Sequence, residues 1–239
     1  MLVMWPTHGY LFHQGLQKLS VAPHLFLLIV LKGIALYFLF VISQGLMQVS
    51  LSSRHYVTPL SVGLIAIINS FLGETLTPGQ WMAALGLCLL SAVFFFKGHL
   101  ADIGKSGRIA YGQLVALAVV LAAFDHVLTR DANWFTLLFI SNITLLITSL
   151  VLHGKDRNLL HAAAFSKSAI LAGIFYAATE LTKFYQQVTI NPVSVVITVQ
   201  AMTKPLILVL SALIWKERTV KEQLLWGILA FIVILPLFF

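Results

Sequence analysis

The chain has 239 residues, of which 59% are apolar and only 10% are charged. Soluble domains have about 25% charged residues, so this composition excludes an ordinary water-soluble globule and indicates a lipid bilayer as the solvent. The net charge of +7 does not indicate nucleic-acid binding, because the basic residues lie in short gaps between apolar runs, as the flanks of membrane segments do.

The residue types that form metal centres and catalytic sites are sparse. The only cysteine, Cys88, excludes an intrachain disulfide and a cysteine-based zinc site. The histidines lie at turns or alone on a helix, without metal-ligand spacing, and no Walker loop, GxSxG or HExxH motif is present. The sequence therefore predicts no metal, no cofactor and no enzymatic activity.

The predicted elements are apolar helices separated by short polar connections. Residues 1–23 precede them as a loop-like segment, without the ordered regions of a signal peptide. A spanning helix needs about 20 mostly apolar residues. Eight runs qualify: 24–47, 56–73, 79–97, 109–127, 133–153, 163–184, 192–215 and 222–239. Because no connection is long enough for a soluble domain, we expect an all-α, multi-pass membrane bundle.

Basic residues concentrate on one side of this predicted bundle. The connections after the first, third, fifth and seventh runs contain most of the Lys and Arg residues. The positive-inside rule places these connections in the cytoplasm and both termini outside. We expect the host to be a cell membrane or a bacterial inner membrane.

An internal repeat relates the second and third runs to the last two. The shift that brings Glu74 onto Glu217 also brings Gln80 onto Gln223. The copies are separated by an odd number of helices, so the second is inverted across the membrane, as in many secondary transporters. For both glutamates we prefer a structural role at the turn, either holding the loop or capping the next helix, to contact with substrate.

The repeated segments "GETLTPGQWMAALG" and "KERTVKEQLLWGIL" resemble the EamA-like branch of the drug/metabolite transporter superfamily. The run "VSVVITVQAMTKPLILVLSALIW" is similar to the penultimate helix of nucleotide-sugar transporters. The resemblance implies ten helices in two halves of five, with secondary transport as the function. Here residues 109–239 match a complete half, whereas 24–97 match a half that lacks its first two helices. The family places both termini in the cytoplasm, which conflicts with the charge count.

Lys204 is the leading candidate for substrate binding. It lies near the middle of run 192–215, with Gln200 and Thr203 beside it, and Pro205 follows. An ionisable residue at this depth is costly and is a functional hypothesis by default. A cation there suits a phosphate or carboxylate, and the alternative is a structural ion pair.

Other polar residues within the runs are further candidates. Lys32 and Tyr37 lie in the first run. Tyr176 and Glu180 share one face of run 163–184 with Lys183. Glu180 could pair with Lys183, pair with Lys204, or take up a proton in coupled transport.

The remaining candidates are polar residues for which helix packing competes with function. Asn142 lies near the middle of run 133–153 and Asn69 near the end of run 56–73. Asparagines commonly join helices in membranes. Asp125 and His126 come near the end of run 109–127, and Asp125 is a second candidate for coupling. Adjacent helical residues point about 100° apart, so these two are not a ready-made dyad.

The sequence thus predicts a secondary active transporter that works by alternating access. Its substrate would be a small anionic or zwitterionic metabolite, such as a sugar phosphate, a nucleotide sugar or an amino acid. Proton coupling and a homodimer are left open. The alternative is a non-transporting membrane subunit, or a truncated paralogue, that packs with another membrane protein.

Overall fold

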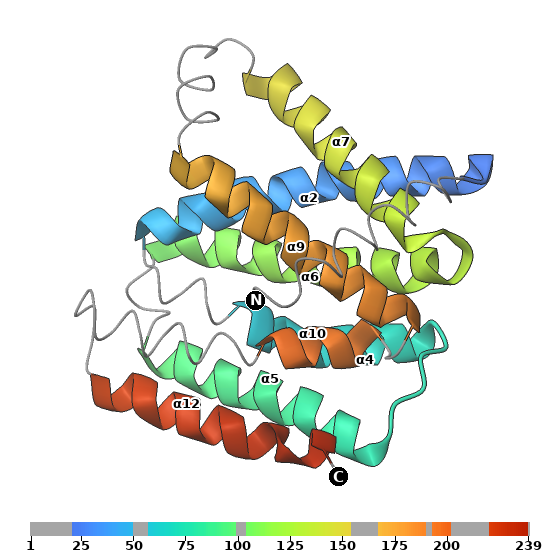
Figure 1. Cartoon of the computed structure of the whole chain (residues 1–239). Helices are drawn as coiled ribbons and strands as arrows, with labels where there is room; N and C mark the ends of the chain where they lie inside the picture. The colour runs from blue at the N-terminus through green and yellow to red at the C-terminus, as the bar shows by residue number, and fades with distance from the viewer. Residues whose placement is uncertain are drawn as a thin grey trace. The chain divides into compact units, whose positions relative to one another are not determined.

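The computed structural model describes residues 21–49, 57–98, 104–153, 167–189, 193–201 and 220–238. Every element in these ranges is helical, which confirms the predicted all-α class. The elements are α2 (Pro23–Val49), α4 (Val57–Phe71), α5 (Pro78–Gly98), α6 (Gly104–Asp131), α7 (Trp134–His153), α9 (Lys167–Thr189), α10 (Val193–Ala201), α12 (Val220–Ile234) and the 3-10 helix η3 (Leu235–Phe238) (Figure 1).

Four of the described helices are long enough and apolar enough to cross a membrane. They are α2, α5, α6 and α7. Helices α4 and α12 contain shorter apolar segments, Pro59–Phe71 and Leu225–Ile234. In the seventh predicted run, α10 covers Val193–Ala201, and residues 202–215 lie outside the described part. The number of eight spans stays a prediction.

The outward-facing side chains are strongly apolar. Phe71 is 88% exposed and Val151 is 75% exposed, and the exposed side chains described on α7 are all Leu, Ile, Val or Phe. Apolar surfaces of this extent are rare on soluble monomers, whereas lipid solvates them without penalty. The exposed surface therefore agrees with the composition in indicating a membrane protein.

The chain forms two compact units. The first contains residues 1–37 and 127–191, and the second contains residues 38–126 and 192–239. In the first unit α7 packs against α9, and the N-terminal part of α2 crosses α7 at Gly33. A Cβ atom on Gly33 would lie 2.6 Å from the Cβ of Thr144 and 2.7 Å from the carbonyl oxygen of Ser141. A small residue at this crossing lets the two backbones approach closely.

The core of the second unit contains buried residues from α4, α5, α6, α10 and α12. Helix α5 lies beside α12, and α4 lies beside α10 (Figure 1). Gly86 of α5 faces Val233 of α12, where a Cβ atom would be 2.6 Å from Cγ1 of the valine. The buried apolar residues of this core are Val62, Ile65, Ala66, Ala84, Leu87, Val119, Ala122, Val193, Ile197, Ala201, Ala230 and Ile234.

Helix α5 begins with a capping box. The backbone N–H of Gln80 donates to Oγ1 of Thr77 (3.3 Å), and the backbone N–H of Thr77 donates to Oε1 of Gln80 (2.9 Å). Pro78 occupies the first helical position, where its missing N–H costs nothing. Local sequence alone thus fixes the start of α5, and with it the end of the turn that begins at Leu72.

Candidate functional site

In the first unit, two of the predicted substrate residues are buried on α2. Lys32 is 3% exposed and Tyr37 is 7% exposed. Tyr176 lies half-buried on α9. Asn142 of α7 donates from Nδ2 to the carbonyl oxygen of Leu138 at 2.8 Å, so part of its hydrogen-bonding capacity serves its own helix.

Glu180 takes the first of the three roles that its sequence context left open. Its Oε2 lies 3.6 Å from Nζ of Lys183, one turn later on α9, and both side chains are largely buried. This spacing is the (i, i+3) geometry that lets neighbouring charges meet on a helix surface. The pair accounts for two charges within a predicted span.

In the second unit, Gln200 is half-buried near the end of α10, and Asp125 of α6 is 3% exposed. Thr203, Lys204 and Glu217 lie outside the described residues. The role of Lys204 in substrate binding therefore stays a prediction.

A buried polar cluster forms where the α4–α5 turn meets the start of α10. We call it the Glu74 cluster, and it consists of Asn69, Glu74, His126 and Ser194. All four residues are at most 6% exposed. Polar side chains in such surroundings need hydrogen-bond partners, and the geometry of the turn supplies them.

The turn that places Glu74 is a Schellman motif. Gly73 has a φ of +91°, a left-handed conformation that glycine adopts without a Cβ clash. The N–H of Gly73 donates to the carbonyl oxygen of Ser70 (3.0 Å), and the N–H of Glu74 donates to that of Asn69 (2.8 Å). These two bonds end α4 in the manner expected of this motif. They place Glu74 directly after the glycine, with its side chain buried.

Glu74 caps α10 from a position 120 residues away in the sequence. Its Oε1 accepts the backbone N–H of Ser194 at 2.9 Å, and its Oε2 accepts the Ser194 hydroxyl. Ser194 is in the first turn of α10, where backbone N–H groups lack helical partners and the helix dipole favours an anion. The sequence suggested a cap on the next helix, but α5 is already capped by Thr77, and Glu74 caps α10 instead.

His126 of α6 completes the cluster. Its Nδ1 lies 3.9 Å from Oε1 of Glu74, and its Nε2 lies 3.4 Å from the carbonyl oxygen of Leu72. Because a carbonyl oxygen only accepts hydrogen bonds, this contact requires the hydrogen on Nε2. Nδ1 is then the nitrogen that faces the carboxylate. Asn69 contributes from α4 by donating from Nδ2 to Oγ of Ser194 at 3.3 Å.

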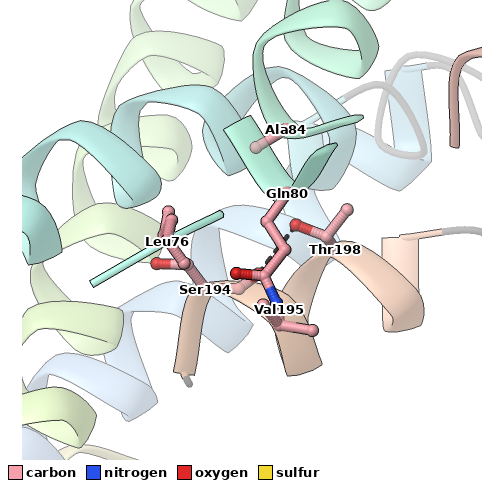
Figure 2. Close-up of a pocket in the computed structure, with 6 residues that line it drawn as sticks. All are labelled: Leu76, Gln80, Ala84, Ser194, Val195 and Thr198. Carbon is pink, nitrogen blue, oxygen red and sulfur yellow. Dashed lines mark hydrogen bonds between the residues drawn. The ribbon is translucent and has the colours of Figure 1, made fainter. Parts of the chain in front are cut away.

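A small recess lies beside the cluster, between α5 and α10. It is lined by Leu76, Gln80, Ala84, Ser194, Val195 and Thr198 (Figure 2). Its volume is about 170 Å³ including space open to the surroundings, and it has no room for a water molecule. Figure 2 shows the hydroxyl of Thr198 turned back toward Ser194, whose carbonyl oxygen it contacts at 2.7 Å. The recess is therefore packing space and not a substrate cavity.

Local sequence patterns do not connect the members of this cluster. They indicate Glu74 as a turn residue, Asn69 as a helix contact and His126 as the neighbour of Asp125, and they do not mark Ser194. A glutamate directly after the glycine that ends an apolar helix was the available signal. Its partners come from distant parts of the chain, and no local pattern identifies them.

The arrangement can hold a negative charge and a proton, but it is not a metal centre. Across the described ranges, no group of three or more His, Cys, Asp or Glu residues could hold a metal ion. The cluster offers one carboxylate, one imidazole and two neutral polar side chains, all inside a helical unit.

No protein-family model matches the sequence, and no curated protein is similar enough to be counted as a relative.

Proposed function

We propose that the protein is a secondary transporter of a small polar metabolite in a multi-pass membrane bundle. The observation that carries this proposal is the burial of ionisable side chains on membrane-length helices. Lys32 on α2 and Asp125 on α6 are each 3% exposed, and both helices are apolar enough to span a bilayer. Charges at such positions are costly and typically belong to substrate or ion pathways.

The proposal includes eight spans and an inverted repeat. Its support is the parallel between the segments that precede α5 and α12. Helix α5 begins directly after Thr77, with Gln80 completing the capping box. Helix α12 begins at Val220, directly after Thr219 in the sequence, and Glu222 follows the threonine by three residues, one residue before the Gln223 that the repeat aligns with Gln80. Threonine followed three residues later by Glu or Gln is a helix-start signal, and here it recurs at both copies.

The basic side chains favour an anionic or zwitterionic substrate. Lys32 is buried, and Lys204 lies mid-way along a predicted span in the sequence. An ammonium group within a bundle stabilises a phosphate or carboxylate that has lost its water shell. Sugar phosphates, nucleotide sugars, amino acids and organic acids share this chemistry.

Uptake into liposomes tests the proposal. The purified full chain, reconstituted into lipid vesicles, should accumulate at least one radiolabelled compound of these four classes above empty vesicles. Lys32→Gln should then lower that uptake about tenfold or more, because removing a hydrogen bond to a charged group costs about 1.5–3 kcal/mol.

Lys97→Gln is the matched control. Lys97 lies exposed at the end of α5, so its replacement removes the same charge without touching a buried site and should leave uptake within about twofold of wild type. Equal uptake by wild type and Lys32→Gln would remove Lys32 from the binding site. If no compound crosses at all, the non-transporting membrane subunit becomes the better account.

A further inference from the structure

Glu74 and His126 are two buried ionisable residues that are not part of the proposed substrate site. Both residues are 6% exposed, and Nδ1 and Oε1 are 3.9 Å apart. A buried carboxylate facing an imidazole has two places for one proton, and the proton neutralises the pair wherever it sits. We propose that Glu74 and His126 together bind one shared proton, and that this proton is the coupling ion of transport; the second part rests on the proposed function.

The described residues of the neighbouring helices contribute few titratable side chains. Helices α4 and α10 pack against it and contribute no titratable side chain among their described residues. Helix α5 has Cys88, which donates to the carbonyl oxygen of Leu60, and Lys97, which lies exposed at the far end. On α6 the nearest titratable neighbour is Asp125, which precedes His126 and is also buried.

The hydrogen bond to Leu72 orients the imidazole for this role. Since Nε2 donates its hydrogen to the Leu72 carbonyl, Nδ1 is left with a lone pair or a second hydrogen toward Glu74. Without the shared proton, the buried pair has a net charge of −1. With it, the pair is neutral overall, which burial favours. A second proton would leave a buried net cation, so the geometry suits one proton and not two.

The same carboxylate links the proton to the position of α10. Glu74 accepts the backbone N–H and the hydroxyl of Ser194 in the first turn of that helix. A proton on His126 leaves this cap intact, whereas its transfer to Glu74 removes the charge that the helix N-terminus favours. Helix α10 also contains Gln200 of the predicted substrate site. The contact between Glu74 and Ser194 therefore links the protonation of the pair to the helix that bears a substrate residue.

Proton counting tests the shared site without any substrate. The purified full chain is acidified from alkaline pH in weakly buffered detergent solution containing a pH indicator. Glu74→Gln and the double variant should each take up about one proton per chain fewer than wild type, since coupled groups titrate as a pair. His126→Gln should take up as many protons as wild type, because one proton still neutralises the remaining buried carboxylate of Glu74.

His24 provides the matched control. It lies exposed near the start of α2, far along the chain from the pair. The losses from His24→Gln and Glu74→Gln should add when the two changes are combined. If the Glu74–His126 double variant takes up two protons fewer than wild type, or if His126→Gln takes up one fewer, the two groups bind protons separately and the shared site is refuted. A double variant that loses no proton refutes it as well. Should Glu74→Gln fail to fold, His126→Gln alone decides, because it leaves the cap on α10 in place.

A pH gradient across liposomes tests the coupling. With the membrane potential clamped, one pH unit can drive about tenfold accumulation of a substrate that moves with one proton. The wild-type chain should show this stimulation with its best substrate, and Glu74→Gln, which lacks the carboxylate that the proton neutralises, should lose it. Uptake that ignores the gradient would overturn the coupling role while leaving transport in place. A measured shared proton in a protein that moves no compound would overturn the transport function and leave the proton site standing.

Discussion

At the scale of single residues, the molecule depends on how a buried charge is satisfied. Glu74 is enclosed at 6% exposure, yet its two oxygens receive three polar contacts: two from Ser194 and one from His126. A charge buried with such partners is tolerated, while its loss leaves the donors unmet. The cluster is therefore sensitive to which atoms are removed as well as to the charge itself.

Two substitutions at Glu74 separate hydrogen bonding from charge. Glu74→Gln keeps one oxygen acceptor for Ser194, whereas Glu74→Ala leaves both donors of Ser194 unsatisfied and opens a gap. We expect Glu74→Ala to lower the free energy of unfolding by about 1–3 kcal/mol more than Glu74→Gln does. Unfolding in mixed detergent micelles with increasing SDS, followed by circular dichroism, measures the difference. Equal stability of the two variants would contradict the cap on α10.

At the scale of elements, helix ends and helix crossings follow from local sequence to different degrees. The start of α5 can be predicted from the sequence, because Thr77 is followed three residues later by Gln80. The end of α4 can be predicted from Gly73. Seven of the eight apolar runs hold a helix within about five residues of the predicted bounds, because length and hydropathy are local properties. In run 192–215 only Val193–Ala201 is described, so the end of that helix stays a prediction. The partner of Glu74 and the helix crossing at Gly33 cannot be predicted from local sequence. Each contact joins segments more than 100 residues apart and depends on packing.

Alanine substitutions at two glycines of α2 should have opposite effects on stability. Gly33 sits against Thr144, where a Cβ atom would be 2.6 Å from the threonine Cβ, whereas a Cβ atom on Gly45 would meet nothing within 4 Å. Gly33→Ala should therefore force α2 and α7 apart and destabilise the fold by about 1–3 kcal/mol. Gly45→Ala should stabilise it by up to about 1 kcal/mol, because alanine is the better helix former.

The pair of variants serves as its own control, since both add one methyl group to the same helix. The midpoint of SDS-induced unfolding is the measurement. A stabilising Gly33→Ala would show that the crossing with α7 is looser than the distances imply.

At the scale of the whole molecule, the proposed membrane topology makes a prediction about the two ends of α6. The helix runs from Gly104 to Asp131 with 28 residues, which at about 1.5 Å per residue is about 42 Å. The hydrocarbon core is about 30 Å thick, so a spanning α6 must leave both ends in water on opposite sides. Lys105 and Asp131 are exposed near these ends, and the charge distribution assigns Lys105 to the cytoplasm.

Cysteine labelling checks this arrangement, because replacing Cys88 gives a cysteine-free background in one change. In bacterial cells, a membrane-impermeant maleimide should label Asp131→Cys from outside, whereas Lys105→Cys should react only in inverted vesicles. Val120→Cys is the matched control: it is exposed near the middle of α6 and should stay unlabelled from either side if lipid covers it. Labelling of both ends from the same side would mean that α6 does not cross the bilayer. Labelling with the two sides exchanged would keep the span but reverse the orientation, which would favour the cytoplasmic termini implied by the family resemblance over those indicated by the basic residues.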